Sequence, residues 1–198
     1  MHDVLIAGAG PAGAIAALVL ARANVRVLLL DRARFPRPKL CGDTVNPGAL
    51  GILRRLGLIH VVDGGLPIAG MVVTGEPLTR VVGLYPAGTA GVSLTRRVLD
   101  ARLIEAAASA GAEVREGVLV RGPLRDDAGV VNGLNVLSRY GRVERVQGRI
   151  VIAADGRFSR VARALGLSCA APSPRRWRCA TGFCRRRSIM PNPIRSAI

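Results

Sequence analysis

Three glycines near the N-terminus, at positions 8, 10 and 13, constrain the fold of this chain more than any other feature. They follow residues 3–7, an aliphatic run without polar alternation that is typical of a strand buried on both faces. Residues 14–23 are rich in Ala and Leu and predict a helix, and residues 25–30 predict a second strand. The order strand, glycine turn, helix and strand predicts a βαβ unit that binds a dinucleotide.

Each glycine of the turn has a separate expected role. Gly8 permits a tight turn, Gly10 lets the backbone approach a pyrophosphate, and Gly13 lets the helix pack closely on the strand. Pro11, in the first turn of the helix, and Ala12 lie next to the unpaired amides and the positive end of the helix dipole, which favour a negatively charged group there. Proline is well tolerated at that position because the first amides of a helix have no partner within it.

An acidic residue ends the second predicted strand. Asp31 follows Leu30, and its carboxylate is suited to accept hydrogen bonds from ribose hydroxyls. The same charge disfavours a phosphate on that ribose, whereas the neighbouring Arg32 favours one. A competing interpretation treats residues 4–21, which carry no charge, as a membrane span or signal sequence. Asp3 and the interrupting glycines and proline favour the βαβ interpretation.

Three further segments carry a resemblance to a known family. They are residues 32–43, which contain a K-x-C-G-D sequence, residues 96–100, and residues 153–163, which begin A-A-D-G. Together with the glycine turn, they resemble the FAD-binding domain of flavoprotein oxidoreductases that include geranylgeranyl reductases and p-hydroxybenzoate hydroxylase-like monooxygenases. The resemblance covers roughly residues 3–170. The K-x-C-G-D sequence leans toward the reductases.

The resemblance implies a Rossmann-like, doubly wound α/β fold of the glutathione reductase type that binds FAD. Its further expected cofactor contacts are Cys41 and Gly42 beside the flavin, Arg97 on FAD and the Val120 backbone at the adenine. The motif of Asp155 and Gly156 is expected near the pyrophosphate. The resemblance implies a prenyl or aromatic small-molecule substrate and leaves NAD(P)H open as electron donor. It supplies no catalytic residue.

The same segments can be interpreted from their residues alone. Residues 148–154 form an apolar run that ends in an Asp-Gly turn, and Ser159 suits the N-cap of a helix over 160–165. Arg97 opens an amphipathic helix that Gly111 ends, and residues 112–120 are expected to form one strand. A surface cation is the alternative interpretation of Arg97, and for Arg96 it is the favoured one.

The predicted organisation is an FAD-binding domain over residues 1–171, followed by a basic tail over 172–198. Residues 66–95 suggest short strands that begin a smaller β-rich substrate domain. A second G-D motif, which the family carries further along, is not found, so we expect a truncated flavoprotein, and an altered reading frame in the tail would explain it. A non-catalytic FAD-binding fragment therefore remains an alternative.

Charge and cysteine content add weaker expectations. The chain carries 29 Lys and Arg against 13 Asp and Glu, which favours nonspecific attraction to nucleic acid or anionic membranes. We expect no specific nucleic-acid binding, because charge runs usually form solvated tails. Four irregularly spaced cysteines predict neither a disulfide framework nor a metal site and fit the cytoplasm. Peripheral membrane contact and the oligomeric state stay open.

Overall fold

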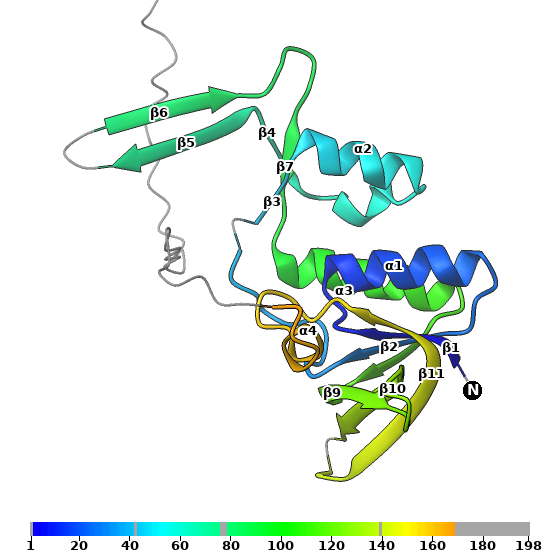
Figure 1. Cartoon of the computed structure of the whole chain (residues 1–198). Helices are drawn as coiled ribbons and strands as arrows, with labels where there is room; N and C mark the ends of the chain where they lie inside the picture. The colour runs from blue at the N-terminus through cyan, green and yellow to red at the C-terminus, as the bar shows by residue number, and fades with distance from the viewer. Residues whose placement is uncertain (1, 42, 76–78, 139, 169–198) are drawn as a thin grey trace, which may run out of the picture.

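A computed structural model describes residues 2–41, 43–75, 79–138 and 140–168. Its centre is a six-stranded sheet in the order β8-β2-β1-β11-β10-β9, seen in Figure 1. The first four strands are parallel to one another, and β9, β10 and β11 form an antiparallel meander. The strands are β1 (His2–Ala7), β2 (Val27–Asp31), β8 (Glu113–Glu116), β9 (Leu119–Arg125), β10 (Val131–Leu137) and β11 (Val143–Ala153).

Two helices lie side by side on one face of the parallel strands, as Figure 1 shows. They are α1 (Pro11–Arg22) and α3 (Arg96–Ser109), and small residues such as Ala14 and Ala17 let α1 lie close to its neighbours. The meander covers the opposite face, where Leu28 and Leu30 pack against Leu134 and Val136. Strands β1 and β2 are thus buried on both sides, which confirms the expectation from their unalternating sequences.

Strand β11 joins the two parts of the sheet. Its first half pairs antiparallel with β10, and residues 148–153 pair parallel with β1. The expected strand over 148–154 is therefore the second half of a longer one. The single strand expected over 112–120 is wrong: Gly117, with a φ of +71°, interrupts it, and the chain leaves β8 to begin β9.

Local end signals behave as their residue types predict. Asn24 ends α1 in the left-handed conformation, with a φ of +59°. The hydroxyl of Ser159 accepts a hydrogen bond of 3.0 Å from the amide of Ala162 and so caps α4 (Arg160–Ala164), after which Gly166 has a φ of +71°. Among the described residues, no helix has the length and apolar character needed to cross a membrane. The uncharged run of residues 4–21 is divided between β1, the glycine turn and α1.

We expect Ser159→Ala to lower the free energy of unfolding by about 1 kcal/mol, since the amide of Ala162 would lose its partner. Urea denaturation followed by circular dichroism measures the change. Ser109→Ala, at the last residue of α3, is the control. An unchanged midpoint for Ser159→Ala would contradict the capping role.

A second group of elements packs beyond α1 and α3. It comprises α2 (Pro47–Arg55), the 3-10 helix η1 (Ile59–Val62) and the strands β3 (Thr44–Val45), β4 (Leu66–Ile68) and β7 (Gly91–Ser93). The hairpin of β5 (Gly70–Gly75) and β6 (Thr79–Leu84) extends away from the rest of the described chain in Figure 1. The expected short strands of residues 66–95 are present, while their role in a substrate domain stays a prediction. The expected tail of residues 172–198 lies outside the described residues.

Candidate dinucleotide site

The carboxyl ends of the parallel strands bring the predicted residues of the glycine turn, Asp31 and Asp155 to one edge of the sheet. The amide of Gly8 donates to the carbonyl of Leu30 at 2.7 Å, and the amide of Ala154 donates to the carbonyl of Ala7 at 2.8 Å. Strand ends at this edge are where open α/β sheets bind ligands. The local sequence explains the gathering, because each strand ends directly before its polar or glycine residues.

Two of the three glycines are required by the protein itself. Gly8 has a φ of +99°, and a Cβ there would lie 2.5 Å from the carbonyl oxygen of Ala154. A Cβ on Gly13 would overlap the carbonyl oxygen of Gly8, so α1 can approach β1 only because this residue has no side chain. The roles predicted for these two glycines, a tight turn and close helix packing, agree with this geometry.

Gly10 is different, because its surroundings are open. The nearest atom to a Cβ placed there is Nη2 of Arg96, at 3.9 Å, and the backbone φ of −69° suits any residue. Gly10 is the N-cap of α1, and within the part of the chain that the structure describes, neither a side-chain cap nor an acidic residue in the first turn satisfies the first amides of this 12-residue helix. Open space beside uncapped amides, at Ala12 and Gly13, is an arrangement that an anionic group fits.

Asp31 holds the turn in place. Its carboxylate accepts the amide of Ala9 at Oδ2 and the amide of Ala33 at Oδ1, each at 2.8 Å. Each carboxylate oxygen has a second lone pair, so these bonds leave capacity for hydroxyl donors of a ligand. The side chain of Arg32 beside it is exposed.

We expect Asp31→Ala to lower the free energy of unfolding by about 2 kcal/mol even without a ligand, because the amides of Ala9 and Ala33 lose their acceptor. Chemical denaturation measures this. Asp127→Ala, at an exposed turn between β9 and β10, removes the same charge and is expected to change stability by less than about 0.5 kcal/mol. Equal effects of the two substitutions would contradict the anchoring role of Asp31.

The arginine beside the glycine turn is Arg96, and the interpretation of this residue as a solvated surface cation is wrong. Its Nε and Nη2 donate to the two carboxylate oxygens of Asp100 at 2.7 and 2.9 Å, and Asp100 is fully buried. This hydrogen bonding raises the pKa of the Arg96 guanidinium, and burial opposes the rise. Arg97, the expected cofactor contact, is exposed on the next position of the helix.

Two interactions around Arg96 and Asp100 were not predicted from the sequence. The carboxylate of Asp43 accepts the amide of Arg96 at 3.2 Å, which ties Asp43 to the start of α3. Arg37 approaches Asp100 at 3.4 Å. The four-residue spacing of Arg96 and Asp100 was a signal for their ion pair, since such residues are neighbours on a helix. Cys41 itself is exposed, and Gly42 lies outside the described residues.

The Asp155 motif forms the opposite side of the site. Its Oδ2 accepts the amide of Arg160 at 2.7 Å, whereas its Oδ1 is buried and has no hydrogen-bond partner within the described ranges. Gly156 turns the chain with a φ of +86°. Val120 is buried in β9. Two residues before it, the amide of Val118 donates to the carbonyl of Asp31 at 2.9 Å. The structure thus places Asp155 at the carboxyl ends of the strands and Val120 two residues beyond the contact of Val118 with Asp31, whereas Arg97 is exposed.

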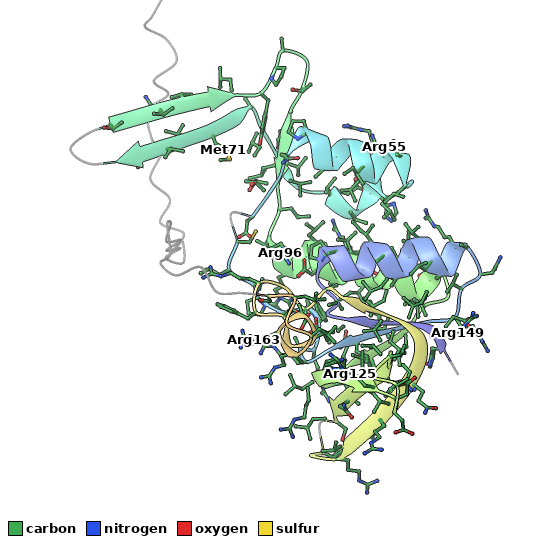
Figure 2. The ribbon with its side chains drawn as sticks, viewed as in Figure 1. Arg55, Met71, Arg96, Arg125, Arg149 and Arg163 are labelled. Carbon is green, nitrogen blue, oxygen red and sulfur yellow. The ribbon has the colours of Figure 1, made fainter. Side chains whose placement is uncertain are left out.

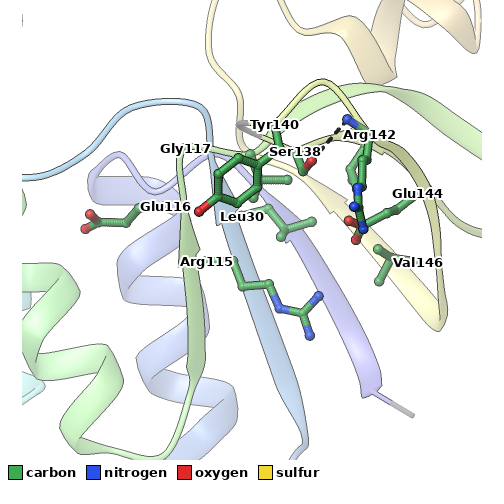
Figure 3. Close-up of a pocket in the computed structure, with 11 residues that line it drawn as sticks. Leu30, Arg115, Glu116, Gly117, Ser138, Tyr140, Arg142, Glu144 and Val146 are labelled. Carbon is green, nitrogen blue, oxygen red and sulfur yellow. Dashed lines mark hydrogen bonds between the residues drawn. The ribbon is translucent and has the colours of Figure 1, made fainter.

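A cavity of about 390 Å³ lies elsewhere, as Figure 3 shows. It is lined by strand residues such as Leu30 of β2 and Arg115 of β8, and by Tyr140 in the turn between β10 and β11, on the sheet face that carries the meander. Beside it, the amide of Arg142 donates to the hydroxyl of Ser138 at 3.2 Å. This cavity is separate from the glycine turn and is not the dinucleotide site.

Comparison with known proteins decides the family. A family profile described as an FAD binding domain matches residues 1–180. The chain belongs to this FAD-binding domain family. The resemblance found in the sequence is confirmed, as is the Rossmann-like α/β fold.

Two curated relatives are reductases. Menaquinone reductase of Mycolicibacterium smegmatis is 36% identical over 168 residues, covering 83% of this chain and 40% of the relative. Digeranylgeranylglycerophospholipid reductase 1 of Methanopyrus kandleri is 39% identical over 166 residues, covering 83% of this chain and 42% of the relative. The chain therefore spans about two fifths of the length of these relatives.

The chain is also similar in structure to a monooxygenase. A flavin-dependent monooxygenase in complex with FAD and substrate matches with a TM-score of 0.68 and 28% identity, over 83% of this chain and 32% of that one. The open space at Gly10, the uncapped amides of α1 and the free lone pairs of Asp31 fit the ADP part of FAD.

Proposed function

We propose that this chain is the cofactor-binding part of an FAD-dependent oxidoreductase that acts on a prenyl or aromatic small molecule. The observation that carries the proposal is Gly10, whose open surroundings lie between the uncapped start of α1 and the guanidinium of Arg96. The two reductase relatives, named for menaquinone and for digeranylgeranylglycerophospholipid, support a lipid-like substrate.

In this proposal, the residues of the chain bind and orient the cofactor. The amides at Ala12 and Gly13 and the guanidinium of Arg96 hold the diphosphate, and Asp31 accepts the ribose hydroxyls. Asp155 supports the turn beside them through its bond to the amide of Arg160. When bound, FAD supplies the redox chemistry, so the protein requires no acid–base residue of its own for the electron transfer.

The electron donor and the location are part of the same proposal. The resemblance to monooxygenases supports NAD(P)H as donor, and the cysteine pattern supports a cytoplasmic protein. Contact with the membrane surface is supported by the exposed apolar side chains of the β5–β6 hairpin, including Met71, Val73 and Leu84. Figure 2 shows Met71 on this hairpin, well away from Arg96.

The test is a titration of the purified chain with FAD, followed by the change in flavin fluorescence. We expect saturable binding of one FAD per chain, which ADP displaces and riboflavin does not, because the contacts described lie on the ADP part. Folded protein that takes up no FAD at saturating concentration would overturn the proposal. Oxidation of NAD(P)H on addition of a prenyl or aromatic substrate separates an enzyme from a fragment that only binds FAD.

A further inference from the structure

A fully buried carboxylate stands next to the candidate site. Asp100 belongs to the face of α3 that packs with Leu99, Leu103 and Ala107 in the core. Placing a charge among apolar side chains costs stability unless the charge is paired, and even a paired buried charge is weak evidence for stabilisation. Its position therefore calls for an explanation other than core packing.

The carboxylate of Asp100 binds two arginines rather than one. Arg96 donates to both of its oxygens, and Nη2 of Arg37 lies 3.4 Å from Oδ2, the oxygen that also accepts Nη2 of Arg96. The side chains of Arg37 and Arg96 are only 18% and 17% exposed. Two guanidinium groups thus converge on one carboxylate oxygen, at the end of Arg96 that faces Gly10.

The loop that carries Arg37 is fixed at a second point. The amide of Phe35 donates to the carboxylate of Glu116 at 3.2 Å, and the Arg37 guanidinium lies 4.8 Å from the centre of the Phe35 ring. Asp43 is the other nearby acid, and its carboxylate bonds the backbone amide of Arg96 at the start of α3. The guanidinium group of Arg37 is consequently held by Asp100 and by stacking on Phe35.

We propose that Asp100 is a positioning residue that presents Arg37 and Arg96 together as a paired-guanidinium subsite for the cofactor diphosphate. This inference rests on the proposed function and adds Arg37 and Asp100 to it. One carboxylate between two guanidinium groups leaves N–H donors of both arginines for phosphate oxygens, which accept charge-assisted hydrogen bonds well. Fixed geometry also removes the cost of ordering two long side chains when the ligand binds.

The decisive variant is Arg37→Gln, because removing Asp100 would leave the partly buried Arg96 without its partner and disturb folding. We expect Arg37→Gln to bind FAD and ADP roughly ten- to a hundredfold more weakly, the range for loss of a charge-assisted hydrogen bond. Arg37→Lys is expected to restore part of the affinity, since it keeps the charge but not the planar fork. Arg55→Gln, at the end of α2, is the matched control and is expected to bind like the parent; Figure 2 shows it away from Arg96.

A phosphorus NMR spectrum of bound FAD supplies a readout that a purely structural role would not move. We expect the diphosphate signals of the Arg37→Gln complex to shift relative to the parent, while its circular dichroism stays unchanged. If the parent binds FAD and Gly10→Val does not, but Arg37→Gln matches the parent in affinity and in the phosphorus spectrum, this inference is overturned and the proposed function stands. If the parent binds no FAD, both are overturned.

Discussion

Gly13→Ala is expected to destabilise the chain by about 3 kcal/mol or more, which is a large share of the stability of a domain of this size. A Cβ at this position overlaps the carbonyl oxygen of Gly8 and lies 3.3 Å from Cβ of Ala154. The clash has no easy relief. The amide of Gly8 is bonded to the carbonyl of Leu30 at 2.7 Å, and the backbone of Ala154 prevents movement of Gly8 to the other side.

Urea denaturation of the protein without cofactor measures this effect. The matched control is Gly51→Ala in the middle of α2, where no atom lies within 4 Å of the added Cβ. That substitution is expected to stabilise the chain by about 0.5–1 kcal/mol, because alanine favours the helix over glycine. If Gly13→Ala unfolded at the same urea concentration as the parent, the close packing of α1 on the glycine turn would be refuted.

The contrast between these glycines shows which features a sequence can predict. The first βαβ unit was predictable because its signals are local: the apolar strand, the glycine spacing and Asp31 lie within about thirty residues. The cap at Ser159 and the stop at Asn24 are local in the same sense. Each of these signals is a particular residue type at a particular position, and none depends on residues far away in the sequence.

The meander was not predictable from such signals. Strand β11 carries Glu144, Arg145 and Gln147 in its first half, and it becomes a strand through pairing with β10, where Val143 faces Leu137. The sequence pattern at residues 112–120 likewise indicated one strand, because nothing local shows that Gly117 adopts a positive φ. Pairing between distant strands, rather than propensity, decides both segments.

In the candidate site, too, some residues could be predicted from local signals and others could not. Two adjacent arginines open α3, and the sequence favoured Arg97 as the cofactor contact and Arg96 as a surface cation, but successive helix positions differ by about 100° in direction. Arg96 turns inward to Asp100, while Arg97 is exposed. Only the position of α3 against the glycine turn, which is a tertiary feature, distinguishes them. The role of Arg37 is hidden for the same reason, because its partner Asp100 lies 63 residues further along the chain.

Gly10→Val is expected to abolish FAD binding and to leave the fold intact. The added side chain would enter the open space beside the first amides of α1, where the diphosphate is proposed to lie. No described residue opposes it, since the nearest atom to the Cβ is Nη2 of Arg96 at 3.9 Å and the φ of −69° is ordinary. We expect FAD affinity to fall at least about a hundredfold, because the loss removes several charge-assisted hydrogen bonds at once.

The substitutions at Gly10 and Gly13 are therefore expected to affect different properties, FAD binding and stability respectively. Gly10→Val is expected to keep the urea midpoint of the parent and lose the FAD-dependent change in fluorescence. Gly13→Ala is expected to lower the midpoint before any cofactor is added. Gly10→Ala, which fills less of the open space, should retain more FAD affinity than Gly10→Val. A Gly10→Val protein that is folded and binds FAD as tightly as the parent would show that the diphosphate does not lie at this turn, because no ligand could then occupy the space that the valine fills.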